Sequence, residues 1–287
     1  MALAVTGGYE LIFRLVPNCA ALRKFIGMAL VIILVLLLGV LTFCRNRDYY
    51  TLVLMWSDVV KKRPGNARGH YNLGNALKKT GRVEEANEHY RRAIFLHPGY
   101  AEAYYNLALN LGDEGRIEES VSYYRQALKL KPDSAQTHTN LGRLLIEREE
   151  EKALAHFREA VRLDPALVSA QLNLANLTAR RGDRTAAIAR YNLVLGMDPD
   201  SDEAHYNLGV TLELGGDRQS AEDHYREAIR LDPRKAEARY NLALLLEGRG
   251  KQGEAMEHLR QVLRIDPGFS GARAALERMG KQVIGNQ

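Results

Sequence analysis

Apolar side chains follow one pattern near the amino terminus and another through the rest of the chain. Residues 25–43, FIGMALVIILVLLLGVLTF, contain no charged side chain and are bracketed by Arg23-Lys24 and by Arg45 and Arg47. A helix of this length spans about 28 Å, close to the ~30 Å hydrocarbon core of a bilayer. We therefore predict one transmembrane helix over 25–43, preceded by an N-terminal flank, 1–24. The run is longer than the ~7–15-residue core of a secretory signal, so we expect the helix to be retained.

A second pattern is set by the prolines. Seven of the eight prolines lie at 64, 98, 132, 165, 199, 233 and 267, spaced by 34 residues except for one spacing of 33. A fixed period of this kind is typical of a solenoid built from repeated units. Counting each unit from the third residue after its leading proline predicts six repeats: 67–100, 101–134, 135–167, 168–201, 202–235 and 236–269.

Within each repeat, the apolar positions predict two antiparallel helices. Position 7 is always Leu, positions 8 and 20 hold small residues, and position 24 is Tyr, Phe or Leu. The apolar residues follow the i, i+3, i+4 spacing of a helical face. In five repeats a Gly lies between the two helices, and the proline ends the second one. The third repeat is a residue short and lacks this Gly, so we expect an irregular turn near Glu147–Lys152.

These residues and this spacing strongly resemble the tetratricopeptide repeat (TPR) over 67–269. The resemblance implies an all-α protein: a right-handed TPR superhelix of six repeats with half-repeat caps, preceded by one transmembrane helix. We assign 44–66 to a linker and an N-terminal capping helix, and 270–287 to a C-terminal capping helix and tail. A single helix pair is marginally stable alone, so each repeat is expected to gain stability from its neighbours.

Charge and candidate chemistry exclude several classes of function. Residues 1–64 carry a net charge of +5, and the remaining residues carry a net charge of zero, which argues against a nucleic-acid partner. The two cysteines and the eight histidines show no close metal-ligand spacing, since seven of the histidines recur at positions 4 and 23 of the repeats. We find no catalytic motif and therefore expect no enzyme activity, no cofactor and no metal.

The most specific polar pattern is an asparagine at position 6 of every repeat. In a TPR superhelix this position faces the concave groove, where an Asn amide can pair with the backbone of an extended peptide. The pattern resembles the asparagine ladder of O-linked N-acetylglucosamine transferases. An alternative is that these asparagines brace the helix pairs. The candidate peptide-binding residues are Asn72, Asn106, Asn140, Asn173, Asn207 and Asn241, with Arg68, Asn75, Arg143 and Asn176 at positions 2 and 9.

Two features limit the identity of the partner. The Lys of a TPR carboxylate clamp is absent from position 2, which favours an internal, extended segment of a partner protein over a free C-terminus. The stretch CRNRDYYTLVLMWSDVVKKRPGNARGHYNLGNAL also resembles the junction between the last membrane helix and the repeats of transmembrane-and-TPR proteins, which are similar to C-type glycosyltransferases. The multi-pass region and the acidic catalytic loop of those proteins have no counterpart in this sequence.

The sequence therefore predicts a single-pass membrane protein that binds partner proteins in its groove as a scaffold. The alternative is an accessory or detached C-terminal part of a membrane glycosyltransferase that presents acceptor protein, and a third possibility is self-association through the solenoid. The resemblance implies that the repeats are extracytoplasmic, whereas the basic residues around the apolar helix lean weakly toward a cytoplasmic C-terminus.

Overall fold

The computed structural model describes residues 20–285, and every regular element within this range is an α-helix. Most of the predicted N-terminal flank lies outside the described residues. The chain divides into two compact units, 1–110 and 111–287, with the boundary inside α5. The helices are α2 (Ala20–Lys62), α3 (Ala67–Lys79), α4 (Val83–Leu96), α5 (Ala101–Asp113), α6 (Ile117–Leu130), α7 (Ala135–Leu145), α8 (Glu150–Leu163), α9 (Val168–Arg180), α10 (Arg184–Met197), α11 (Asp202–Leu214), α12 (Arg218–Leu231), α13 (Ala236–Gly248), α14 (Gln252–Ile265) and α15 (Ser270–Gly285).

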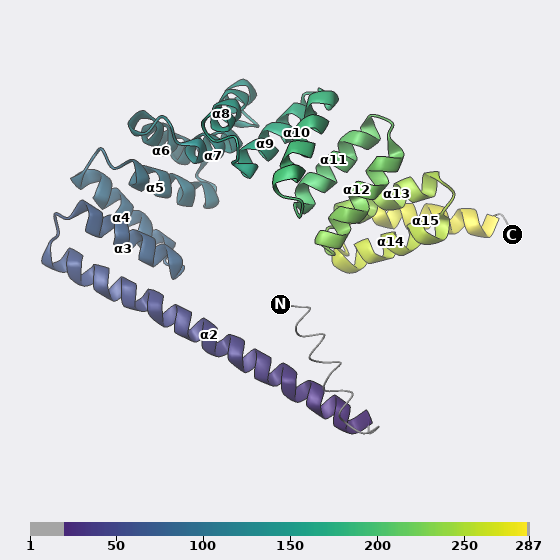
Figure 1. Cartoon of the computed structure of the whole chain (residues 1–287), viewed down its shortest axis with the longest axis horizontal. Helices are drawn as coiled ribbons and strands as arrows, with labels where there is room; N and C mark the ends of the chain where they lie inside the picture. Colours follow the sequence, from purple (N-terminus) through teal and green to yellow (C-terminus); the bar gives the residue numbers. More distant parts are fainter. Residues whose placement is uncertain (1–19, 286–287) are drawn as a thin grey trace. The chain divides into compact units, whose positions relative to one another are not determined.

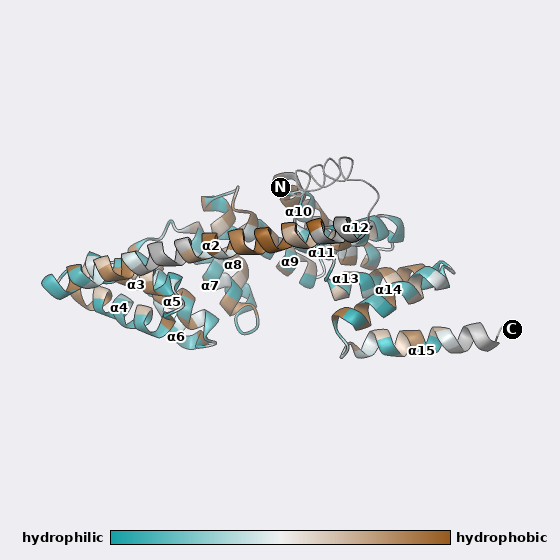
Figure 2. Ribbon diagram, turned by 90° about the horizontal axis from the view of Figure 1, so that it is seen from below, coloured by the Kyte–Doolittle hydropathy of each residue, from teal (hydrophilic) through white to brown (hydrophobic). Residues whose placement is uncertain are grey.

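The first unit begins with a single continuous helix, α2, of 43 residues (Figure 1). Its segment Ile26–Phe43 is long and apolar enough to cross a membrane, and hydrophobic residues line it (Figure 2). The residues that we expected to form a linker after position 43 are helical. The reason is local: residues 44–62 contain neither Gly nor Pro, so no backbone constraint interrupts the helix. Near its end, Val53 is buried and α2 packs against α3.

The helices recur at the spacing of the predicted repeats, and five of the six repeats have a large ring at position 24, whereas the sixth has Leu259. Tyr90, Tyr124, Phe157, Tyr191 and Tyr225, all at position 24, are at most 1% exposed. The small residue at position 8 is a steric requirement in three repeats, because a Cβ added at Gly74, Gly142 or Gly209 would lie 2.6–2.8 Å from the ring of its own repeat. Packing a ring against a bare backbone lets the two helices approach closely.

Five turns between paired helices contain a glycine with a left-handed backbone. Gly81, Gly115, Gly182, Gly216 and Gly250 have φ between 75° and 90°, as the sequence pattern predicted. A residue with a Cβ adopts this region only at a cost, which explains why Gly ends these first helices.

The irregular turn predicted in the third repeat is confirmed. Helix α7 ends at Leu145 after 11 residues, and α8 begins at Glu150. The backbone N–H groups of Arg148 and Glu149 both donate to the carbonyl oxygen of Leu145, at 3.1 and 2.7 Å. This compact turn takes the place of the glycine turn and accommodates the missing residue.

Ion pairs to both neighbouring repeats hold this turn. Glu147 pairs with Arg180 of α9 at 2.6 Å, and Glu149 pairs with Arg125 of α6 at 3.2 Å. The turn before α8 is therefore linked to α6 and to α9. Each pair is partly exposed to solvent, so its contribution to stability is modest.

At the carboxyl end, α15 closes the solenoid as a lone helix. Its residues Ala272, Ala275 and Met279 are buried in one cluster with Leu246 of α13 and Leu259 of α14. On the other face of α15, Glu277 and Arg278 are exposed. A charged outer face is what a terminal capping helix requires for solubility.

Candidate peptide-binding groove

The six position-6 asparagines lie on the first helices of their repeats and are all partly buried. They therefore combine contact with the protein and access to solvent. Arg68 and Arg143, which were grouped with them in the sequence, are exposed.

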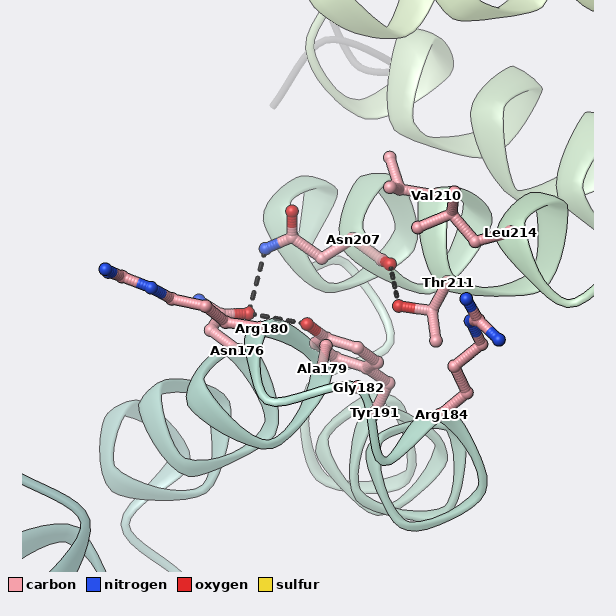
Figure 3. A pocket seen from close by; sticks show the side chains of 10 residues that line it. All are labelled: Asn176, Ala179, Arg180, Gly182, Arg184, Tyr191, Asn207, Val210, Thr211 and Leu214. Atoms are coloured by element: carbon pink, nitrogen blue, oxygen red, sulfur yellow. Dashed lines mark hydrogen bonds between the residues drawn. The ribbon is translucent and has the colours of Figure 1, made fainter. Parts of the chain in front are cut away.

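The same hydrogen-bonded cluster of three side chains occurs once in each unit. In the second unit, Oδ1 of Asn176 accepts hydrogen bonds from the Tyr191 hydroxyl at 2.8 Å and from Nδ2 of Asn207 at 2.9 Å (Figure 3). Position 9 of one repeat thus joins position 24 of the same repeat to position 6 of the next. The burial of Tyr191 raises the pKa of its hydroxyl, which keeps it protonated as a donor.

The first unit contains the same cluster with the same distances. Oδ1 of Asn75 accepts from the Tyr90 hydroxyl at 2.8 Å and from Nδ2 of Asn106 at 2.9 Å. Asn106 and Asn207 thus each donate to an asparagine of the preceding repeat, so they link successive repeats rather than the two helices of one repeat. Each bracing bond uses one N–H of the amide, so the amide can still offer further groups to a ligand.

Asn173 and Asn241 have partners of other kinds. Nδ2 of Asn173 donates to the backbone carbonyl of Ser169 within α9 at 2.7 Å. Nδ2 of Asn241 lies 3.5 Å from the hydroxyls of Tyr206 and Tyr225, at the limit of a hydrogen bond. These amides can reorient toward a ligand at lower cost than those of Asn106 and Asn207.

A pocket of about 600 Å³ lies beside the cluster in the second unit. Its walls come from α9 and α10 of the fourth repeat and α11 of the fifth (Figure 3). The lining combines amides and guanidinium groups with an apolar surface that includes the largely exposed Leu214. The lining residues are Asn176, Ala179, Arg180, Gly182, Arg184, Tyr191, Asn207, Val210, Thr211 and Leu214.

A smaller pocket of about 200 Å³ occupies the equivalent place in the first unit. Both pockets lie between the position-24 residue of one second helix and positions 6, 9, 10 and 13 of the following first helix. In this smaller pocket Trp56 of α2 takes the place of Tyr191. Its lining residues are Leu52, Trp56, Asn72, Asn75, Ala76 and Lys79. The structure thus brings four of the predicted site residues, Asn72, Asn75, Asn176 and Asn207, into two pockets of the same register.

The sequence did not reveal that histidines at positions 4 and 23 form pairs. In the first, third and fifth repeats the two Nδ1 atoms lie 2.9 Å apart. Nε2 of each position-4 histidine lies 3.0–3.2 Å from the carbonyl oxygen of the preceding proline. If this Nε2 carries the proton, the Nδ1 of the position-23 histidine must donate to its partner. The signal was present in the sequence, because both positions are histidine in the same three repeats, at His70 and His89, His138 and His156, and His205 and His224.

Burial makes these pairs poor proton acceptors. Desolvation lowers the pKa of His89 and His224, and it lowers that of His156 to about 4, with the partner histidine acting in the same direction. Protonation of the accepting Nδ1 would place two Nδ1–H groups face to face. Among the described residues, no group of three or more His, Cys, Asp and Glu side chains is arranged to hold a metal ion.

Comparisons with known proteins identify the family. Profiles of the tetratricopeptide repeat match residues 74–113, 101–134, 172–234 and 215–268, which together exceed half of the chain. The chain therefore belongs to the tetratricopeptide-repeat proteins, as its 34-residue period predicted.

Individual relatives resemble parts of the chain. Protein O-mannosyl-transferase TMTC1 of Mus musculus is 35% identical over 95 residues, which are 31% of this chain and 10% of that protein. The chain thus spans about a tenth of the length of this relative. A chain in the crystal structure of the APC/C hetero-tetramer Cut9–Hcn1 matches with a TM-score of 0.68 and 19% identity. The match covers 81% of this chain and 46% of that chain. YrrB, a TPR protein with an unusual peptide-binding site, matches with a TM-score of 0.55 and 24% identity over 64% of this chain and 95% of its own.

The cluster around Asn176 predicts a measurable contribution to stability. Asn176→Ala removes the acceptor of the Tyr191 hydroxyl, whose residue is 1% exposed, and should lower the free energy of unfolding by about 1–3 kcal/mol. Asn173→Ala removes only a bond within its own helix and should cost clearly less. Thermal unfolding followed by circular dichroism compares the two variants, and equal losses would contradict the bracing role.

The histidine pairs predict acid destabilisation. Unfolded histidines bind protons near pH 6.5, whereas burial lowers the pKa of His70, His89, His156 and His224 in the fold, so the free energy of unfolding falls as the pH falls from about 7 to 4. Each proton that only the unfolded state binds lowers the free energy of unfolding by about 1.4 kcal/mol per pH unit of acidification. The double variant His138→Gln/His156→Arg copies the fourth repeat, in which Nε2 of Gln171 donates to the Pro165 carbonyl at 3.0 Å.

Unfolding measured across this pH range should show a shallower acid loss in the double variant than in the wild type. The exposed His97 provides a control, since His97→Gln should leave the slope unchanged. A double variant with the wild-type slope would show that the third-repeat pair does not resist protonation.

Proposed function

We propose that this protein is a membrane-anchored TPR scaffold whose concave groove binds extended segments of partner proteins. The observation that carries the proposal is the pair of equivalent pockets, one in each unit, with a position-6 asparagine in the wall of both. A groove that repeats the same amide at the same register suits a chain whose own backbone repeats.

The chemistry of the groove fits peptide backbone better than a compact ligand. An extended peptide presents one N–H and one C=O at nearly every residue, and an Asn side chain offers both a donor and an acceptor. The larger pocket is open between two repeats and combines these amides with apolar walls such as Val210 and Leu214. Backbone pairing would supply general affinity, and the pockets would select side chains.

Membrane anchoring rests on the exposed apolar surface of α2. In Ile26–Phe43 nearly every large side chain is exposed, with Leu36 at 63% and Phe43 at 68%. A continuous apolar surface of this size is unfavourable in water and favourable in lipid. The same helix continues to Lys62, and its Val59 lies against Gly69 of the first repeat, which favours a retained anchor over a cleaved signal sequence.

A second candidate function follows from the likeness to the mouse O-mannosyl-transferase over 95 residues. The chain would then work beside a membrane glycosyltransferase and present acceptor protein to it, with its repeats on the extracytoplasmic side. The groove would serve the same binding step in both cases, and the catalytic step would belong to the partner enzyme.

The groove can be tested with a variant that spares the bracing asparagines. Asn72→Ala/Asn173→Ala/Asn241→Ala should strongly reduce capture of partner proteins from cell extracts, because each lost amide removes about 0.5–1.5 kcal/mol of contact. Asn192→Ala, an exposed asparagine on α10, should capture them like the wild type. Undiminished capture by the triple variant, with its fold verified by circular dichroism, would remove the ladder from the binding mechanism.

The anchor can be tested with tags at both ends of the chain. We expect one species that carries both tags and stays in the membrane pellet after alkaline extraction. Leu34→Lys/Leu37→Lys should release it, since each charge at the centre of a span costs about 2.5–3.5 kcal/mol on insertion scales. Loss of the N-terminal tag from the mature protein would instead identify a cleaved signal, and protease protection of the C-terminal tag would show which side the repeats occupy.

A further inference from the structure

The pocket between the fourth and fifth repeats has an apolar wall that the pocket of the first unit lacks. Both pockets have a position-6 asparagine, and positions 9 and 13 of the same helix also line them. These two positions are Val210 and Leu214 in the second unit, whereas they are Asn75 and Lys79 in the first. Since an asparagine amide pairs with any peptide backbone, positions 9 and 13 are the ones that distinguish the two pockets.

Leu214 is an apolar side chain that the fold does not bury. It is 65% exposed, more than any other large apolar side chain that the structure describes in the second unit. The other repeats with a glycine turn have Lys79, Asp113, Arg180 and Gly248 at this position, so the packing of the helices does not require a leucine there. Leu214 lies one turn after Val210 on the same face of α11, and together they leave an apolar surface open to a ligand.

Arg184, in the wall of the same pocket, has no acidic partner. Among the side chains that the structure describes, none forms an ion pair with its guanidinium. The other arginine of the wall, Arg180, pairs with Glu147 of the preceding repeat at 2.6 Å. Figure 3 shows that the side chain of Arg184 points toward α11, whereas that of Arg180 points away from it.

The acidic residues next to this site in the sequence have other partners. Asp183 is the N-cap of α10, and its carboxylate accepts a hydrogen bond from a backbone N–H of that helix at 3.1 Å. Glu213 accepts a hydrogen bond from the hydroxyl of Tyr225 at 2.7 Å. A carboxylate that a ligand brings to the pocket would therefore be the first acidic partner of Arg184, and an arginine can bind a carboxylate through two parallel hydrogen bonds.

We propose that the pocket formed by Asn207, Val210, Leu214 and Arg184 binds an extended partner segment in which an apolar side chain lies two residues from an Asp or Glu. Residues i and i+2 of an extended chain face the same side and lie about 7 Å apart, so the apolar side chain can enter the pocket while the carboxylate pairs with Arg184. Oδ1 of Asn207 points away from the asparagine cluster and can accept a backbone N–H (Figure 3). This rests on the proposed function of the groove and names the side chains that one of its pockets selects.

The chemistry of the site favours a partner protein over two other occupants. A small anion would pair with Arg184 but would leave the surface of Val210 and Leu214 in water. A second copy of this chain has no extended segment within residues 20–285, because every regular element in that range is a helix and the connections are three or four residues long. An extended peptide with both kinds of side chain satisfies the two walls together.

The test uses the full-length protein in nanodiscs of phosphatidylcholine. The probe is a fluorescent peptide with blocked termini and three copies of Leu-Thr-Glu-Thr, in which the Leu and Glu side chains share one face of the extended chain. Two comparison peptides have Gln in place of every Glu or Ala in place of every Leu. We expect the acidic peptide to bind about tenfold or more tightly than either comparison peptide, because each of these loses one of the two contacts.

The position of the peptide can be mapped directly. A photoreactive leucine analogue replaces the middle Leu of the acidic peptide, and mass spectrometry identifies the cross-linked residues. We expect the cross-link on the α11 segment that contains Val210 and Leu214.

Charge reversal tests the arginine. Arg184→Glu should weaken binding of the acidic peptide by about tenfold or more and should strengthen binding of a peptide with Lys in place of Glu. The matched control is Arg218→Glu at the same position of the fifth repeat. Arg218 is exposed, lies outside the pocket lining and follows the N-cap Asp217 as Arg184 follows Asp183, so its reversal should change binding by less than about twofold.

The apolar wall has its own pair of variants. Leu214→Gln should weaken binding of the acidic peptide, whereas Leu193→Gln, which changes an exposed leucine of α10 outside the pocket lining, should leave it unchanged. The three residues Arg184, Leu214 and Leu193 are all exposed, and circular dichroism verifies that the variants keep the helical fold.

No binding of the acidic peptide, equal binding of the Glu and Gln peptides, equal effects of Arg184→Glu and Arg218→Glu, or a cross-link outside the pocket would each overturn this inference. If Asn72→Ala/Asn173→Ala/Asn241→Ala abolishes partner capture from cell extracts while Arg184→Glu/Leu214→Gln does not change it, the inference fails and the groove function stands. If neither variant affects capture, both fail.

Discussion

The close approach of the two helices in each repeat is the constraint on which the rest of the structure depends. A large ring at position 24 packs against a Gly at position 8 in the first, third and fifth repeats, and the ring is almost fully buried. This contact sets the separation of the helices, and in five repeats a left-handed glycine sets the angle at which the chain turns between them. The sixth repeat has the buried Leu259 in place of the ring, and the third has the compact turn at Leu145 in place of the glycine.

Two of the position-6 asparagines have a clear architectural role. Asn106 and Asn207 connect successive repeats through the shared acceptors Asn75 and Asn176. Asn173 donates to a backbone carbonyl of its own helix, and Asn241 lies at the limit of hydrogen bonding from two tyrosine hydroxyls. Because an amide has two donors and an acceptor, an asparagine that holds its neighbour still has groups that can pair with a ligand.

Helix α2 joins the apolar segment to the repeats without a break. The last turns of α2 lie against α3 as the second helix of one repeat lies against the first helix of the next. Trp56 takes the place of the position-24 ring in the first pocket. An anchor that is also a capping helix would hold the first repeat near the membrane, whereas a flexible linker would leave its position free. The first pocket therefore lies between the last turns of α2 and the first helix of the first repeat.

The sequence by itself determined the repeats, their boundaries and the apolar segment, because these depend on local periodicity. Proline and glycine act on the backbone where they stand, and an apolar stripe at helical spacing specifies which face is buried. The third-repeat turn was also predictable, since the loss of a residue and a glycine changes local geometry directly.

Only the tertiary structure decided which polar groups meet. The histidine pairs join residues 18 or 19 positions apart, and the asparagine clusters join residues 15 and 31 positions apart. Such contacts depend on how one helix lies against the next, which short-range periodicity does not encode. For the same reason, the sequence identified the asparagines as groove residues but did not show which of them brace the repeats and which two positions open into pockets.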